Sequence, residues 1–218
     1  MKHLKLQKIQ NNLRNKFSRL GVKMVGPETI YFSKDTKIGK NVTIEPYVVF
    51  GTKVKIGNNV TIKSFSHLEN CKVENKVDVG PYARIRPGTV LKDGSKVGNF
   101  VEIKKSIIGK KSKVSHLTYI GDSTIGKSVN VGAGTITCNY DGVNKHKTTI
   151  GKRSFIGSNT SLIAPINIGN DANIAAGSSI SKDVDSNSLA ITRAPIKFIS
   201  NWSKKIKETN KEEEKCVE

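Results

Sequence analysis

The sequence is poor in aromatic residues and in cysteine. Only 6% of its 218 residues are Phe, Trp or Tyr, and hydrophobic residues of all kinds make up 36%. This composition argues against a thick, aromatic-filled interior and suits a narrow core of small and β-branched side chains. The cysteines, Cys71, Cys138 and Cys216, are far apart and form no Cys-x-x-Cys pair. A disulfide framework or a zinc site is therefore not expected, and a reducing, cytoplasmic compartment fits.

Long apolar runs and metal-ligand spacings are missing as well. No stretch approaches the ~18 consecutive apolar residues of a membrane-spanning helix. The basic N-terminus lacks the apolar segment of a signal peptide. The four histidines, His3, His67, His116 and His146, do not have the spacing of metal ligands. We therefore expect neither membrane insertion nor a metal.

Acidic residues are scarce compared with basic ones. The chain has 18 Asp and Glu against 37 Lys and Arg, a formal net charge of +19. Such an excess favours anionic partners such as phosphorylated small molecules, or else it reflects a lysine-rich solvated surface. No helix-turn-helix, zinc-finger or aromatic RNA-binding signature accompanies the charge, so nucleic acid is not an expected partner.

The feature that dominates the sequence is an apolar residue at every sixth position. These anchors run through Ile38, Ile44, Phe50, Ile56, Ile62 and Leu68, continue with occasional five-residue steps to Val131, and resume from Ile150 to Ile180. The residue four positions after an anchor is small or β-branched in almost every repeat. The residue directly after the anchor is often Gly. This period fits neither a helix nor a simple strand. It predicts a parallel β-helix with three short strands in each coil.

The repeat divides the chain into three parts. We expect an all-β hexapeptide-repeat β-helix over residues 23–186, and a C-terminal extension with a charged tail over 187–218. Residues 1–22 carry Leu6, Ile9, Leu13, Phe17 and Leu20 at helical spacing. That amphipathic helix would lie on a membrane surface or pack on the β-helix or on a partner.

One loop, residues 137–149, interrupts the repeat. It contains Asn-Tyr-Asp-Gly, which favours a turn. The loop is either an insertion at a tolerant corner or a functional element, and long loops on a regular scaffold are more often functional.

Three side chains stand out against the repeat. Arg86 and Lys104 occupy the position after an anchor, often held by Gly, and they lie 18 residues apart, which is one full coil. Stacked cations predict a phosphate clamp. Alternatively, exposed corners simply tolerate cations, as Lys63 and Lys92 at the same position indicate. His116 follows anchor Val114 by two residues, on the face from which the loop leaves, and is either a general base or a solvated histidine.

Longer segments resemble a known family. VGPYARIRPG (79–88), VGNFVEIKKS (97–106), HLTYIGD (116–122), NVGAGTITCNYDGVNKHKT (130–148) and LAITRAP (189–195) are similar to the acetyltransferase domain of bifunctional N-acetylglucosamine-1-phosphate uridyltransferase/glucosamine-1-phosphate acetyltransferases (GlmU). The resemblance runs from about residue 24 to about 195. It implies a left-handed β-helix, a homotrimer with active sites between subunits, and transfer of acetyl from acetyl-CoA to glucosamine 1-phosphate in UDP-N-acetylglucosamine biosynthesis.

The resemblance also implies roles for individual residues. His116 would be the general base, and Lys145 would reach in from another subunit. The implied sugar-phosphate ligands are Arg86, Lys104, Tyr119, Asn130 and Lys145. The implied acetyl-CoA contacts are Ala133, Asn139, Tyr140, Ser158, Ala176 and Arg193.

The chemistry agrees with those roles. The amine must lose a proton to attack the thioester, and a backbone N–H of the Gly132–Gly134 turn would stabilise the oxyanion. We expect direct transfer without a metal. An acyl-enzyme on Cys138 is the less favoured route, because nothing in the sequence obviously activates this thiol.

One departure from the family concerns the uridyltransferase activity. Nothing in the chain resembles the nucleotidyltransferase domain with its Gly-rich loop, so no uridyltransferase activity is expected. A separate nucleotidyltransferase would then be a partner, or the chain would be a remnant. Two further hypotheses stay open: a hexapeptide acyltransferase for another amino sugar, and a non-catalytic β-helix scaffold.

Overall fold

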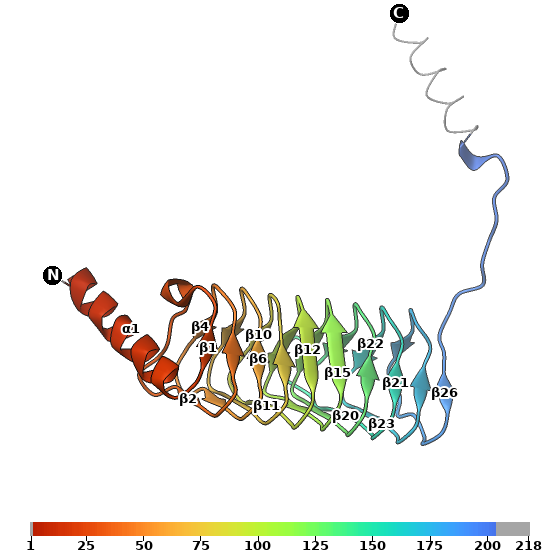
Figure 1. Ribbon diagram of the computed structural model, residues 1–218. Helices are drawn as coiled ribbons and strands as arrows, with labels where there is room; N and C mark the ends of the chain where they lie inside the picture. The colour runs from red at the N-terminus through yellow and green to blue at the C-terminus, as the bar shows by residue number, and fades with distance from the viewer. Residues whose placement is uncertain (1, 204–218) are drawn as a thin grey trace, which may run out of the picture.

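The computed structural model describes residues 2–203, so most of the predicted charged tail lies outside the described residues. Helix α1 (Lys2–Arg19) lies at one end of a long solenoid of stacked coils, and a short 3-10 helix, Pro27–Thr29, belongs to the first coil (Figure 1). Each coil contributes one short strand to each of three parallel sheets, of ten, eight and eight strands. The predicted parallel β-helix is therefore confirmed.

The three sheets are named A, B and C. Sheet A contains β1 (Lys23–Met24), β3 (Thr43–Ile44), β6 (Thr61–Ile62), β9 (Asp78–Val79), β12 (Lys96–Asn99), β15 (Lys113–His116), β18 (Asn130–Val131), β21 (Phe155–Ile156), β24 (Asn173–Ile174) and β26 (Leu189–Ala190). Sheet B contains β4 (Val49–Phe50), β7 (His67–Leu68), β10 (Arg84–Ile85), β13 (Glu102–Lys104), β16 (Tyr119–Gly121), β19 (Ile136–Cys138), β22 (Ser161–Ile163) and β25 (Ser179–Ile180). Sheet C contains β2 (Lys37–Ile38), β5 (Lys55–Ile56), β8 (Cys71–Val73), β11 (Thr89–Leu91), β14 (Ile107–Ile108), β17 (Ser123–Ile125), β20 (Thr148–Ile150) and β23 (Ile166–Ile168).

The anchors form the core, as the repeat predicts. Ile44, Ile62 and Leu68 have no exposed surface, and neither does Val48, which lies four residues after an anchor. Each anchor pairs in register with the anchor one coil away, for example Ile85 with Ile103. The chain turns at corners where non-glycine residues adopt a positive φ, among them Asn59 and Lys76. Side chains at equal positions in successive coils therefore stack in columns.

The repeat extends slightly further than the periodicity indicates. Strand β1 lies before the first anchor, Ile38, and pairs in parallel with β3, and the Pro27–Thr29 helix stands in the first coil between β1 and that anchor. At the other end β26 pairs with β24 beyond residue 186. Pairing also continues through Cys138 and resumes at Thr148, so the part of the loop outside the ladder is residues 139–147. These boundaries shift because backbone pairing depends on the neighbouring coil, which hydrophobic spacing does not report.

Helix α1 closes the first coil. Phe17 is 2% exposed and packs on Phe32, which stacks on Phe50 with ring centroids 5.1 Å apart. The Gln10 carboxamide donates to the Phe32 carbonyl and accepts from the Phe32 N–H, each at 2.9 Å. The helix thus packs on the solenoid, and no helix among residues 2–203 has the length and apolarity needed to cross a bilayer.

We expect Gln10→Ala to lower the free energy of unfolding of the end coil by about 1–3 kcal/mol, because a buried backbone N–H and carbonyl lose their partner. Urea denaturation followed by circular dichroism measures the effect. Asn12→Ala, on the exposed side of α1, is the matched control. Equal midpoints for the two variants would contradict this account of the cap.

Candidate functional site

His116 lies at the end of the longest strand pair of sheet A. Strands β12 and β15 have four residues each, so their register extends to the pair Asn99 and His116. The His116 Nδ1 lies 2.7 Å from the Asn99 Oδ1. Because a carbonyl oxygen only accepts, this contact requires the proton of a neutral imidazole to be on Nδ1, which leaves the lone pair of Nε2 free. The side chain is exposed and borders a hollow of about 370 Å³ that Lys63, Asp78 and Lys96 also line.

Four of the residues expected to contact acetyl-CoA lie along one edge with His116. Ala133, Ser158 and Ala176 each follow their anchor by two residues, as His116 does, so they continue its column through the next coils. Backbone bonds hold this edge: the Ala133 carbonyl accepts from Asn159 at 2.7 Å, and the Ser158 carbonyl accepts from Gly177 at 2.8 Å. Arg193 Nη2 donates to the Ala176 carbonyl at 3.1 Å. The edge is a track of small side chains between an imidazole and a guanidinium.

A second group lies where sheet B turns into sheet C. Arg86 is paired with Glu102 at 2.6 Å, and Lys104 lies one coil further. Lys145, from the loop, lies beside Lys104 of the same chain, and the pKa of Lys104 is lowered, first by the neighbouring Lys145 ammonium and then by burial. Arg86 lowers the pKa of Lys104 further, whereas Asp122 raises it. Cations held this close favour a doubly charged anion between them.

Tyr119 and Asn139 belong to this second group. A Cβ atom built on Gly121 would lie 2.5 Å from the Tyr119 hydroxyl oxygen and 2.7 Å from the Asn139 Nδ2, so both side chains lie over this glycine. Gly121 is the register partner of Lys104. Asn139 is buried and donates to Asp122 at 2.5 Å. Glycine at position 121 therefore makes room for the polar groups beside Lys104.

The loop has its own internal order. Tyr140 and Lys145 form an isolated antiparallel bridge, and the Tyr140 hydroxyl donates to the Gly142 carbonyl at 2.5 Å. Asp141 contacts His146 Nε2 at 2.6 Å and accepts from two backbone N–H groups, and these hydrogen bonds hold the pKa of Asp141 well below its usual range. This order positions Lys145. Tyr140 itself is 58% exposed.

The predicted site residues thus divide between two regions of one chain. His116, Ala133, Ser158, Ala176 and Arg193 line the edge between sheets A and B. Asn130 lies on sheet A opposite Lys113. Arg86, Lys104, Tyr119, Asn139 and Lys145 gather at the far end of sheet B.

Sequence reasoning missed Asn99, Glu102 and Asp122. Asn99 was detectable, because it is the residue in the position of His116 one coil earlier. Glu102 and Asp122 carried no signal, because an acidic residue on the outward side of a strand or at a corner resembles any solvated carboxylate.

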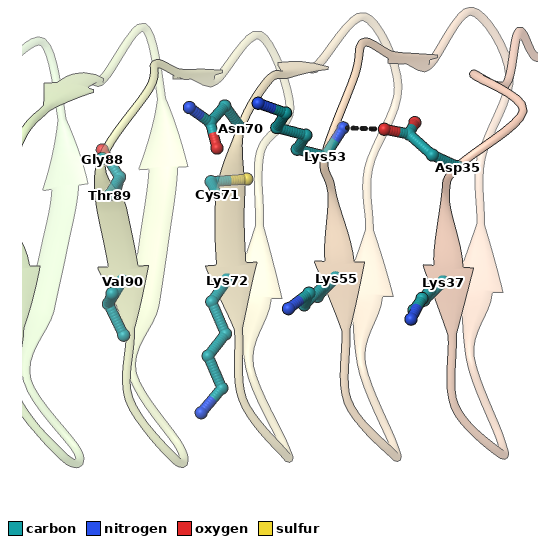
Figure 2. A pocket seen from close by; sticks show the side chains of 10 residues that line it. All are labelled: Asp35, Lys37, Lys53, Lys55, Asn70, Cys71, Lys72, Gly88, Thr89 and Val90. Carbon is teal, nitrogen blue, oxygen red and sulfur yellow. Dashed lines mark hydrogen bonds between the residues drawn. The ribbon is translucent and has the colours of Figure 1, made fainter.

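A different hollow, of about 450 Å³, lies on the lysine-rich side of sheet C (Figure 2). Lys37, Lys55 and Lys72 lie in register along it. Its floor includes Cys71, whose thiol is buried, which raises its pKa to about 12. None of the predicted site residues lines this hollow. Within residues 2–203, no group of three or more His, Cys, Asp or Glu side chains is arranged to hold a metal ion.

Comparison with known proteins places the chain among hexapeptide-repeat proteins. Residues 35–70 match the family "bacterial transferase hexapeptide (six repeats)", and residues 147–182 match the hexapeptide repeat of succinyl-transferase. The bifunctional protein GlmU of Zymomonas mobilis is 52% identical over 202 residues, which cover 93% of this chain and 45% of that protein. GlmU of Rhizobium rhizogenes is 57% identical over 85% of this chain and 41% of its own length. The chain spans less than half the length of these relatives.

Solved structures show the same fold at low sequence identity. The UDP-N-acetylglucosamine O-acyltransferase from Moraxella catarrhalis has a TM-score of 0.56 at 18% identity, covering 77% of this chain and 70% of that one. The UDP-N-acetylglucosamine acyltransferase from Campylobacter jejuni has a TM-score of 0.52 at 17% identity, covering 84% and 81%. At these identities the likeness concerns the fold alone.

We expect Lys145→Gln to raise the pKa of Lys104, because the neighbouring cation that disfavours its protonation is removed. Inorganic phosphate added to the unaltered protein should also raise it, since an anion favours the charged ammonium. NMR titration of ¹³C-methylated lysines measures both effects. Lys147→Gln, an exposed change in the same loop, should leave the Lys104 pKa in place. An unchanged pKa in Lys145→Gln would show that the two ammonium groups do not interact.

Proposed function

The chain belongs to the GlmU family, of which it corresponds to the acetyltransferase part, and from this premise we propose that it is a glucosamine-1-phosphate N-acetyltransferase. It would transfer acetyl from acetyl-CoA to the 2-amino group of the sugar phosphate. The proposal concerns acetyl transfer alone.

The observation that carries the proposal is the cluster of three cations at one corner: Arg86 and Lys104 stack in successive coils, and the ordered loop brings Lys145 beside Lys104. Neighbouring ammonium groups repel each other unless an anion lies between them. A phosphate monoester offers several acceptor oxygens and close to two negative charges at neutral pH. Tyr119, beside Lys104, adds a hydroxyl group suited to a sugar.

His116 supplies the base. Its Nε2 takes a proton from the amine as the nitrogen attacks the thioester carbonyl carbon. The carbon–sulfur bond then breaks, and the leaving CoA thiolate receives the proton from the imidazolium. Holding amine and thioester together contributes much of the rate enhancement.

The developing oxyanion has a specific candidate donor. In the turn after β18, the N–H of Gly132 donates to the Ile156 carbonyl and that of Gly134 donates to the Leu117 carbonyl. The N–H of Ala133, between them, has no such backbone partner in the described part of the chain. We assign it to the oxyanion. Acetyl-CoA would extend from there along Ser158 and Ala176 to Arg193.

A second copy of the chain completes the site. His116 lies on the edge between sheets A and B, whereas Lys104 lies at the far end of sheet B, so a homotrimer would bring the base edge of one subunit to the phosphate-binding region of the next. In this arrangement Lys145 reaches His116 from another subunit, together with Lys104, Arg86 and Tyr119. Asn130 would belong to the same subunit as His116.

An exposed aromatic ladder supports subunit contact at this edge. Tyr47, Phe65, Tyr82 and Phe100 stack with ring centroids 4.8–5.0 Å apart, and each ring is about half exposed. The next residue in the column is Leu117, which is 61% exposed and follows His116 directly. Contiguous apolar surface of this kind marks interaction sites. A subunit packed on the ladder would lie next to the base.

The first test is release of CoA thiol from acetyl-CoA, without added metal. We expect release that requires glucosamine 1-phosphate and falls at least about 100-fold in His116→Ala, because general-base catalysis contributes ~10²–10⁴. No release from a folded protein would refute the proposal in favour of a scaffold. Release with other amino sugars alone would indicate a different acceptor.

The shared site has its own test. We expect His116→Ala and Lys104→Ala to be inactive alone. After unfolding and refolding as an equal mixture they should regain about a quarter of the activity of the unaltered protein. About a quarter is the chance that both subunits forming a site in a random trimer carry the residue that the site needs. The double variant His116→Ala/Lys104→Ala, mixed with an equal amount of either single variant, is the control and stays inactive. Absence of recovery in mixed trimers would show that one chain supplies both residues.

A further inference from the structure

We infer that Asn99 is the positioning residue that fixes the tautomer and direction of the His116 ring. The inference rests on the proposed function, because it assigns the group that keeps Nε2 available as the base. Asn99 is half-buried, belongs to the strand next to that of His116, and was not among the residues that the sequence resemblance implied.

The contact is built by an extension of the sheet. Most strands of sheet A have two residues, but β12 and β15 have four and end at Asn99 and His116. The extra pairing brings the two side chains out next to each other, so that the Asn99 Oδ1 lies 2.7 Å from the His116 Nδ1. The backbone turns directly after each of these two strands, at Phe100 with a φ of 53° and at Leu117 with a φ of 48°. The Leu117 N–H donates to the Asn99 carbonyl at 3.0 Å, which fixes the backbone on both sides of the pair.

Gly98 permits this close approach. A Cβ atom at position 98 would collide with the carbonyl oxygen of Ser115, the residue before His116. Any larger side chain would push β12 from β15 and separate Asn99 from the imidazole. Gly98 and Asn99 together therefore form a platform for the base.

The contact selects one tautomer. A free neutral imidazole populates both N–H forms, whereas a ring whose Nδ1–H donates to an amide oxygen keeps the Nε2 lone pair for the substrate amine. The charged groups that share the hollow with His116 are Lys63, Asp78 and Lys96, and Lys113 lies on its own strand. Asp78 lies 3.5 Å from Lys96, so its charge is already paired. Asn99 is neutral, so it orients the ring without adding charge.

The experiment compares Asn99→Ala with Asn99→Asp in the full chain. Asn99→Ala should lower kcat about 10-fold or more with little change in the KM of either substrate, and by less than His116→Ala. Asn99→Asp keeps an acceptor for Nδ1–H and should restore much of kcat. Its carboxylate favours the imidazolium, so the acid limb of the pH–rate profile should move up by about one pH unit. Asn173→Ala, which removes an exposed amide from sheet A, is the matched control and should retain full activity.

A spectroscopic readout makes the result independent of turnover. In ¹⁵N spectra at alkaline pH, with the His116 signals assigned by their loss in His116→Ala, the unaltered ring should show Nδ1 protonated. Asn99→Ala should shift the population toward the Nε2–H form. An unchanged tautomer and a kcat within about twofold of Asn173→Ala would overturn the inference. If the unaltered protein does not acetylate glucosamine 1-phosphate, the proposed function fails, and the tautomer still decides the role of Asn99.

Discussion

Coil-on-coil backbone pairing is the constraint on which the rest of this structure depends. In each of the three parallel sheets, every strand except the two at the ends is bonded to the strands one coil before and one coil after it. Because the pairing is in register, the residue at a given position in one coil lies directly against its equivalent in the next. The narrow interior accepts one column of Ile, Leu and Val per sheet, and this explains the scarcity of aromatic residues. The aromatic rings inside are mainly those at the α1 end, where Phe17, Phe32 and Phe50 close the column.

The same constraint organises the candidate site. Any side chain that departs from the repeat is displayed beside the equivalent residue of the next coil, as for Asn99 and His116. The small residues at the later positions of that column form a continuous track for the same reason. The cation cluster depends on more than stacking, because Lys145 lies outside the ladder and comes beside Lys104 through the order of the loop. Regular and irregular backbone therefore have distinct parts in the proposed chemistry.

Much of the fold could be predicted from the spacing of the apolar residues, because a period of six identifies which residues face inward. Spacing also placed Arg86 and Lys104 one coil apart, as their register confirms. It was wrong about the root of the loop: we expected the loop to leave from the face of His116, but pairing continues through β19, so the loop leaves at the far end of sheet B. It did not show that His116 and Lys104 lie in separate regions of one chain, because that depends on the width of sheet B and on side-chain direction. Nor did it reveal the contact of Lys104 with Lys145, which depends on how Asp141 and His146 order the loop. Spacing could have shown that Asn99 lies one coil before His116. Its role became clear only from the structure, in which β12 and β15 pair as far as these two residues.

The loop does not disturb the solenoid. Ser123 pairs with Thr148 and Thr148 pairs with Ile166, so the coils on either side continue in the same register although residues 139–147 depart from the ladder. An excursion that preserves register leaves the core the same whatever its length or composition. The corner therefore works as an attachment point, where new chemistry can be exchanged by segment replacement while the scaffold is inherited intact. Evolution and protein engineering can both use this modularity, since the two halves of the solenoid need only meet in phase.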